Sequence, residues 1–367
     1  MHREINGVRR FIMRFLTSKI SHCVSNRDIS LLKNSPIKRI LIIRPNSRLG
    51  NQLLLTPLIQ EISTVFPQCK LDIFVRGNLA PVLYKNYSNI DQIIKLPPKP
   101  FKQLLAYIKV WFSLSKRRYD LVINADVNSS SGRIATNLCR SKIKFYNCFN
   151  PEKLKQVPDY EHMGKGAVYN LRDFLGRGGY LTGEQPIPFL SLRLSQTELS
   201  NGALKLREIA QTNKPVICIY TFATGTKCYP KYWWRELYSR IKRTYEDHFS
   251  ILEVLPKENV SQIDFSAPTY YSTDIREMGA VISQSAIFIS ADCGIMHLAS
   301  SAGTPTVGLF STTKIDIYAP YNPGSIAIDT TRTSIEEIMV HIHKILTPYC
   351  SGGLPCHPHF TNYFSFL

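Results

Sequence analysis

Residues 290–313, SADCGIMHLASSAGTPTVGLFSTT, hold the clearest combination of residue types that could do chemistry. An apolar run ends at Asp292, the chain turns at Cys293 and Gly294, and a helix-like segment begins at Ile295. The first backbone N–H groups of a helix are unpaired and lie at the positive end of its dipole, so they bind phosphate, and a glycine there lets the backbone approach closely. The pattern predicts an anion site, although an ordinary strand-to-helix turn shares its local features.

A second polar loop, residues 221–237 (TFATGTKCYPKYWWREL), follows another apolar run. Thr224 and Thr226 offer hydroxyl groups and Lys227 offers a cation, and such groups bind phosphate oxygens. We expect Lys227 and the histidine of the first loop, His297, to face the same anion. The alternatives are a solvated loop lysine and a histidine that is satisfied within its own helix.

The third polar loop is RPNSRLGNQLLLTP, residues 44–57. Its arginines, Arg44 and Arg48, could hold a phosphate of a second substrate, with solvated arginines as the alternative. In the same half of the chain, Asp126 ends the apolar segment YDLVINAD. A carboxylate at that place could act as a general base, with a helix N-cap or a loop acid as the alternative.

Alternating strand-like and helix-like segments position these loops. Short apolar runs predict buried parallel strands, and apolar residues at helical spacing between them predict helices, which is the pattern of a doubly wound α/β domain. A stretch rich in Gly and Pro, residues 176–188, breaks the pattern and predicts a domain junction. The expected strands are residues 38–45, 71–77, 90–97, 119–126, 215–222, 249–256, 286–292 and 304–310, and the expected helices include residues 53–66, 101–118 and 231–245.

The chain of 367 residues therefore divides into two Rossmann-like α/β domains. We expect the domains to face each other across a cleft, with the loops after their strands pointing into it. The predicted parts are a basic amphipathic leader (1–36), two Rossmann-like domains (37–185 and 186–346) and a C-terminal tail (347–367).

Composition narrows the class of partner. The net charge of +18 predicts attraction to polyanions, and the absence of a recognisable nucleic-acid module favours a membrane or a phosphorylated glycan over nucleic acid. Nine cysteines without a disulfide pattern favour a reducing compartment. The tail cluster lacks a zinc-ligand spacing, so no metal site is predicted from its members, Cys350, Cys356, His357 and His359.

Residues 1–20, MHREINGVRRFIMRFLTSKI, place apolar residues at helical spacing among arginines. Arg14 interrupts the apolar stretch and no small-residue cleavage site follows, which is typical of an interfacial basic helix and not of a signal peptide. This segment predicts binding to an anionic membrane surface. A disordered or packed N-terminal extension is the alternative.

The complete string of residues 290–313 is more specific than a strand-to-helix turn. It resembles the nucleotide-diphosphate loop of glycosyltransferase family 9, the ADP-heptose:lipopolysaccharide heptosyltransferase family. The loop at 221–237 resembles the family's lysine-aromatic-proline-x-x-x-tryptophan signature, shifted around Cys228, in its residues Lys227, Tyr229, Pro230 and Trp234. The resemblance implies a GT-B fold of two Rossmann-like domains. It also implies transfer of a sugar, such as a heptose, from a nucleotide-diphosphate donor to a lipopolysaccharide or related cell-surface glycan.

The resemblance also assigns donor residues. Lys227 would neutralise the departing diphosphate, and Glu258, with Glu253 as a rival, would bond the nucleotide ribose. Cys293 stands where relatives carry Thr or Ser, so a hydroxyl contact would be lost while the backbone contact remains. The residues expected to bind the donor are Thr224, Thr226, Lys227, Glu258, Asp292, Cys293, Gly294 and His297.

The general base departs from the family pattern. Relatives commonly carry an Asp directly after the Gly of the first loop, and that Asp is thought to deprotonate the acceptor hydroxyl. This chain has Asn51 there, and an amide cannot act as a general base. We therefore predict that Asp126 replaces it, and that Arg44 and Arg48 bind the acceptor. No D-x-D pair is present, which predicts transfer without a metal, and the family resemblance implies that the transfer is inverting and uses no cofactor.

Two competing functions remain. A catalytically inactive relative that binds a nucleotide sugar is favoured by Asn51. An NAD-dependent oxidoreductase would need G-x-G-x-x-G after the first strand, and RPNSRLGNQ does not supply it. The cysteine usage and the basic leader predict a cytoplasmic protein that is peripheral on the inner face of the cytoplasmic membrane.

Overall fold

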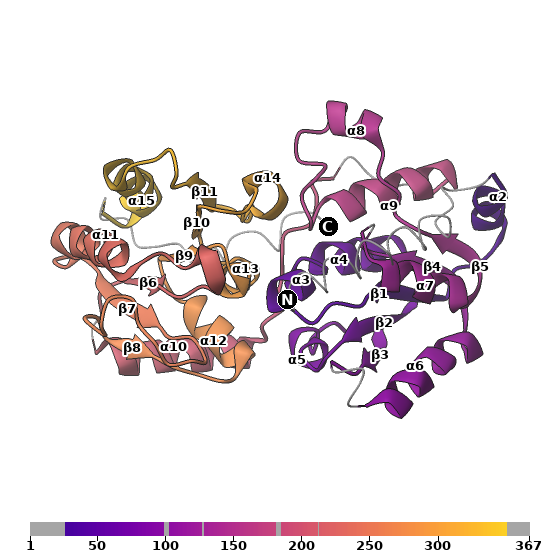
Figure 1. Cartoon of the computed structure of the whole chain (residues 1–367), viewed down its shortest axis with the longest axis horizontal. Coiled ribbons are helices and arrows are strands. Elements are labelled where there is room, and N and C mark those ends of the chain that lie inside the picture. Colours follow the sequence, from indigo (N-terminus) through magenta and orange to yellow (C-terminus); the bar gives the residue numbers. More distant parts are fainter. Residues whose placement is uncertain (1–25, 99–102, 127, 181–184, 212, 351–367) are drawn as a thin grey trace, which may run out of the picture. The chain divides into compact units, whose positions relative to one another are not determined.

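The computed structural model describes residues 26–98, 103–126, 128–180, 185–211 and 213–350 (Figure 1). The chain divides into two compact units, unit 1 (Met1–Pro188) and unit 2 (Phe189–Leu367), whereas the sequence places the division after residue 185. The membrane-binding prediction for residues 1–20 lies outside the described residues, and so does the tail from residue 351.

Unit 1 is built on a five-stranded parallel sheet with the order β3-β2-β1-β4-β5. Figure 1 shows helices on both sides of this sheet, with α9 above the strands and α6 below them. Its strands are β1 (Arg39–Arg44), β2 (Lys70–Arg76), β3 (Ile90–Leu96), β4 (Arg118–Asn124) and β5 (Arg140–Phe145). Its helices are α2 (Asn26–Asn34), α3 (Leu49–Leu53), α4 (Thr56–Val65), α5 (Ala80–Leu83), α6 (Leu104–Lys116), α7 (Ser130–Leu138), α8 (Pro151–Gln156) and α9 (Gly166–Arg177).

The helix expected over residues 53–66 is wrong at its start. The structure has a short helix, α3, followed by α4 from Thr56, and the break falls at Leu54 and Leu55. Pro57 explains where α4 begins, because proline lacks an N–H and is tolerated in the first turn of a helix, where that N–H has no partner.

Unit 2 is built on a six-stranded parallel sheet with the order β11-β10-β9-β6-β7-β8. The two parallel-sheet α/β domains predicted from the sequence are thus confirmed. The strands are β6 (Val216–Tyr220), β7 (Ser250–Val254), β8 (Thr269–Tyr270), β9 (Ile287–Ala291), β10 (Thr306–Phe310) and β11 (Ile326–Asp329). The helices are α10 (Gln196–Ala210), η2 (Gly225–Lys227), α11 (Lys231–Tyr245), α12 (Ile275–Ile282), α13 (Gly294–Ser301), α14 (Ile315–Tyr318) and α15 (Ile335–Cys350).

The central strands of unit 2 are buried along their whole length, as continuous apolar runs predict for a parallel sheet covered on both faces. Strand β9 lies between β6 and β10. The loops that follow these three strands therefore leave the sheet side by side at its carboxyl edge, where parallel sheets bind ligands. Within the described residues, no helix combines the length and the apolar character needed to cross a bilayer.

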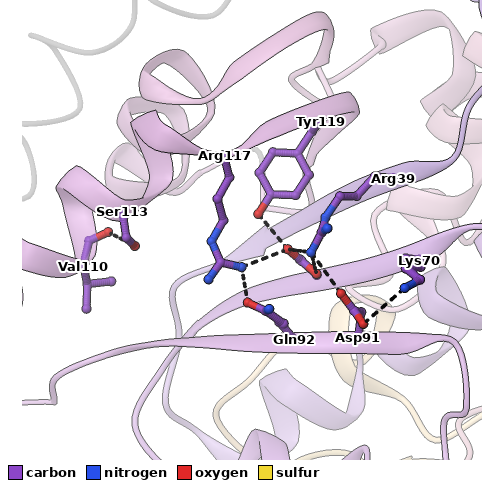
Figure 2. A network of polar contacts seen from close by, with 9 residues as sticks. Arg39, Lys70, Asp91, Gln92, Val110, Ser113, Arg117 and Tyr119 are labelled. Carbon is purple, nitrogen blue, oxygen red and sulfur yellow. Dashed lines mark hydrogen bonds and ion pairs between the residues drawn. The ribbon is translucent and has the colours of Figure 1, made fainter.

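A buried carboxylate organises the amino ends of the strands in unit 1. Asp72, in β2, is fully buried and accepts hydrogen bonds from Arg39 (3.1 Å), Arg117 (3.3 Å) and the Tyr119 hydroxyl (2.8 Å). Figure 2 shows these three side chains converging on one point, with Arg39 also paired to Asp91. Because chemistry in parallel sheets gathers at the opposite edge, this cluster serves the fold.

We expect Asp72→Asn to lower the free energy of unfolding by about 2 kcal/mol, because an amide leaves two arginines without their buried counter-charge; their partial exposure keeps the cost below that of a fully buried pair. Chemical unfolding followed by circular dichroism measures it. Asp91→Asn is the matched control, and its more exposed carboxylate should contribute less than about 1 kcal/mol. Equal effects would contradict the role given to Asp72.

Candidate functional site

The first candidate site lies where β9 ends and α13 begins. The Asp292 N–H donates to the Leu309 carbonyl of β10 at 2.9 Å, so the sheet ladder extends to Asp292. Cys293 is the N-cap of α13 and has an extended backbone, but its side chain makes no capping hydrogen bond. The Cys293 sulfur lies near the N–H groups of Ile295 and Met296 but is a weak acceptor, so these N–H groups remain suited to an anion.

Asp292 brings three loops together. Its side chain is only 5% exposed, and its Oδ2 lies 2.5 Å from Lys227 Nζ, which comes from the loop after β6 and is 33% exposed. The Thr313 hydroxyl, from the loop after β10, donates to the same oxygen. The carboxylate is thereby paired and hydrogen-bonded, as a buried charge must be. The ammonium group of Lys227 has three N–H donors, so it can bind a second anion besides Asp292.

His297 lies in the second turn of α13 and is buried. Its ring centroid is 6.4 Å from that of Tyr318 in α14, and Lys227 Nζ lies 5.8 Å from the centre of the same tyrosine ring. Within the described residues the Nδ1 atom of His297 has no hydrogen-bond partner. A buried polar atom without a partner is rare and at a site of this kind indicates a place for a ligand.

Burial sets the protonation of two groups at this helix start. It lowers the pKa of His297 to about 4; attraction to Asp292 opposes the shift and repulsion by Lys227 adds to it. Burial likewise raises the pKa of the Cys293 thiol to about 11. Both side chains are therefore neutral near pH 7, and Lys227 together with the helix N–H groups supplies the positive potential.

The loop before Lys227 exposes hydroxyl groups. Thr226 lies beside Lys227 in the short helix η2, Thr224 is the N-cap of this helix, and both threonines are exposed. Between them Gly225 has a φ of +69°, a conformation that side chains with a Cβ adopt rarely. The structure thus places both predicted threonines next to Lys227 in the chain.

The two candidate ribose acids differ in exposure. Glu258 is exposed and lies 3.8 Å from Lys257 Nζ. Burial raises the pKa of Tyr220, at the end of β6, and both Cys293 and Glu258 lie near enough to raise it further. Glu253 is fully buried in β7 and accepts a 2.6 Å hydrogen bond from the Thr221 hydroxyl. Glu258 is therefore the acid that a ligand at this edge can reach.

In unit 1 the residues of the first loop are exposed to different degrees. Arg48, just before α3, is exposed, and Asn51, within α3, is half-buried. Arg44, at the end of β1, is only 2% exposed, and its Nη1 donates to the Ala125 carbonyl at 3.4 Å. Among the described residues, the buried Nε of Arg44 has no hydrogen-bond partner. Arg48 is thus the arginine that is accessible to an acceptor.

Asp126 follows β4, the neighbour of β1, so it emerges at the same sheet edge as the loop of Asn51. Its Oδ1 accepts the N–H of Asn128 at 3.0 Å, and its carbonyl accepts the N–H of Ser129 at 3.0 Å. Ser129, and not Asp126, is the N-cap of α7. The carboxylate is therefore held in a turn at the carboxyl edge of the sheet.

Comparison with known proteins decides the family. The model of glycosyltransferase family 9 (heptosyltransferase) matches residues 107–342, more than half of the chain. The chain belongs to glycosyltransferase family 9. No curated protein sequence matches it.

Solved structures of other family 9 proteins have the same fold. A glycosyl transferase family 9 structure from Veillonella parvula aligns with a TM-score of 0.67 and 15% identity, over 84% of this chain and 97% of that one. The Escherichia coli heptosyltransferase WaaC with ADP aligns with 0.62 and 16%, over 84% and 99%. E. coli ADP-heptose lps heptosyltransferase II aligns with 0.57 and 15%, over 84% and 98%. With the two parallel-sheet domains, this similarity confirms the GT-B fold.

Sequence reasoning missed two residues of the candidate site in unit 2. Thr313 ends the string of residues 290–313, and Tyr318 follows shortly after it, but neither was expected to contact Asp292 or Lys227. The available signal was their position after β10, since the loop after a strand next to β9 must emerge beside Asp292.

Acidification should destabilise unit 2 through His297. Because the pKa of His297 is about 4 in the folded chain and about 6.5 in the unfolded chain, only the unfolded chain binds the proton between these values. The free energy of unfolding should therefore drop by about 1–2 kcal/mol between pH 7 and pH 5 through this group. Denaturant unfolding of the native chain and of His297→Asn at both pH values measures the contribution, which the variant should lose. An equal drop in both proteins would mean that folding does not lower the pKa of His297, so that the folded chain also binds this proton by pH 5.

Proposed function

We propose that this family 9 member transfers a sugar from a nucleotide-diphosphate donor to a lipopolysaccharide or related cell-surface glycan acceptor. The observation that carries the proposal is the group at the start of α13, where Lys227 pairs with buried Asp292 and the buried Nδ1 of His297 has no partner among the described residues. This group joins a lysine, helix N–H groups and an orphaned polar atom, which together suit a diphosphate.

In this proposal each donor residue contacts a different part of the nucleotide diphosphate or holds another residue in place. The Lys227 ammonium and the first N–H groups of α13, next to Cys293 and Gly294, balance the charge that develops on the departing diphosphate. Neutral His297 contributes a hydrogen bond through its ring. The hydroxyls of Thr224 and Thr226 bind phosphate oxygens. Asp292 holds Lys227 in place, and Glu258 bonds the ribose.

The E. coli WaaC structures contain ADP and ADP-2-deoxy-2-fluoro heptose. An ADP-linked heptose is therefore the first donor to test. The decisive experiment measures which nucleotide diphosphate raises the melting temperature and which nucleotide sugar then supports transfer, because a ligand that binds only the folded state stabilises it according to its occupancy. No stabilisation by any nucleotide diphosphate would remove the donor site.

We propose an inverting transfer in which unit 1 binds the acceptor. Asp126 is the general base that takes the proton from the acceptor hydroxyl, and Arg48 binds an acceptor phosphate. Buried Arg44 is proposed to position the acceptor site indirectly. It donates a hydrogen bond to the carbonyl of Ala125, the residue before Asp126. Lys227 and α13 balance the leaving-group charge, which supports transfer without a metal. We further propose that the protein lies on the inner face of the cytoplasmic membrane, and the net charge of +18 supports its attraction to anionic lipids there.

A second candidate function is a catalytically inactive protein that binds a nucleotide sugar. Asn51 favours it, since the carboxylate that relatives carry after the glycine is absent from this position. Glu61, in α4, is not a substitute, because Arg172 holds both of its oxygens at 2.7 and 2.8 Å. The two functions differ in one result, which is stabilisation by a nucleotide sugar without any transfer.

We expect Lys227→Gln to weaken binding of ADP by about 10- to 100-fold, the loss of one charge-assisted hydrogen bond of about 1.5–3 kcal/mol. Isothermal titration calorimetry measures it. The matched control is Lys231→Gln, because Lys231 is a nearby, exposed lysine paired with Asp264. If both variants bind ADP equally well, Lys227 does not contact the diphosphate.

We expect Asp126→Asn to lower the transfer rate by about 10²- to 10⁴-fold while donor affinity stays the same, because a general base contributes that much. Adding Asn51→Asp to this variant should restore part of the rate. Asp173→Asn is the control, since Asp173 is an exposed acid of unit 1 paired with Lys153. Normal transfer by Asp126→Asn would assign the base to another group.

A further inference from the structure

The outer face of α6 (Leu104–Lys116) is apolar and exposed. Leu105 is 77% exposed, Phe112 65%, Leu104 55% and Ile108 40%. In a helix of 3.6 residues per turn these positions lie on one side, so the exposed side chains form a continuous stripe. A single exposed apolar residue needs no explanation, but a contiguous stripe of large ones marks an interaction surface.

The fold of unit 1 does not need this stripe. The opposite side of α6 packs on the sheet through Leu114, which is fully buried, and through Tyr107, Val110 and Trp111. The Trp111 ring centroid lies 5.8 Å from that of Phe74 in β2. In Figure 1, α6 has strands on one side only. Within the part of the chain that the structure describes, the outer stripe therefore remains available to a partner.

The charges beside the stripe are of one sign. Lys109 and Lys116 lie about one helical turn after Leu105 and Phe112, next to the stripe. The sequence of α6, LLAYIKVWFSLSK, contains no acidic residue. Arg118, just beyond the helix, is exposed as well. An apolar face bordered by cations is the pattern of a helix that lies in the interface of an anionic bilayer.

We propose that the outer face of α6 docks on the surface of an anionic phospholipid bilayer. The stripe enters the boundary of the acyl chains, and Lys109, Lys116 and Arg118 meet the headgroup phosphates. A bilayer matches both the apolar and the cationic character. The basic leader, residues 1–20, and a second copy of a chain with a net charge of +18 match only the apolar part, since both would bring like charge to the lysines.

The test is sedimentation of the full chain with vesicles of equimolar phosphatidylcholine and phosphatidylglycerol. Leu105→Ser combined with Phe112→Ser should lower the partition coefficient by at least about tenfold, because two large apolar side chains no longer leave water. Leu204→Ser is the matched control. Leu204, in α10 of unit 2, is 64% exposed but is not part of a stripe of exposed apolar residues. Lys109→Gln with Lys116→Gln should weaken binding further and reduce its dependence on salt.

A second measurement reports α6 itself and separates it from the leader. Vesicles with brominated acyl chains should quench the fluorescence of F112W more than that of the unsubstituted protein, and should not add quenching to L204W. Three results would overturn the proposal: unchanged partition of the double serine variant, no added quenching of F112W, or loss of a dimer in the double variant without vesicles. Transfer to a water-soluble acceptor is measured in parallel and should be unchanged, so failure of docking and failure of the transferase proposal are distinguished.

Discussion

One buried carboxylate, Asp292 at the end of β9, is the constraint on which the site of unit 2 depends. A carboxylate that is 5% exposed is tolerated only with a cation and hydrogen-bond donors around it. Lys227 and Thr313 meet that need from the loops after β6 and β10, the strands on either side of β9. Pairing one charge therefore fixes three loops at the edge where α13 begins. Burial of His297 keeps its ring neutral, so the ring adds no charge to the positive potential of Lys227 and the helix start.

Unit 1 distributes its charge in the reverse way. Its buried carboxylate, Asp72, lies near the amino ends of the strands, where two arginines and a tyrosine hydroxyl hold it for stability. At the carboxyl edge the buried charge is a cation, Arg44, which donates to a backbone carbonyl beside Asp126. An edge with arginines and one carboxylate suits an anionic acceptor whose hydroxyl must lose a proton, while the edge of unit 2 suits a diphosphate.

How much the sequence could predict follows from the range of each interaction. The strands and the turn at Cys293 and Gly294 follow from apolar runs and local turn chemistry, and the structure confirms them. Thr313 and Tyr318 depend on strand order, because only the placement of β10 beside β9 brings them to Asp292 and Lys227. The burial of Arg44 could not be predicted either, since the sequence shows an arginine at a strand end but not which residues cover it. The N-cap of α7 is Ser129, because the Asp126 carboxylate accepts the N–H of Asn128 in the turn that precedes the helix.

An amide at position 51 does not by itself leave this edge of the sheet without a carboxylate. Strands β1 and β4 are neighbours, with Ile43 paired to Asn124. The loop that leads to Asn51 and the turn that holds Asp126 therefore leave adjacent strand ends. The turn fixes the orientation of Asp126 through one oxygen, and the second oxygen of a carboxylate can still accept a proton. As the proposed base, Asp126 would lose little freedom on acceptor binding, which is how positioned groups lower a barrier. Donor binding depends on no residue of unit 1 in this scheme. A chain that has lost its base would therefore keep its donor site unchanged, and binding and transfer have to be measured separately.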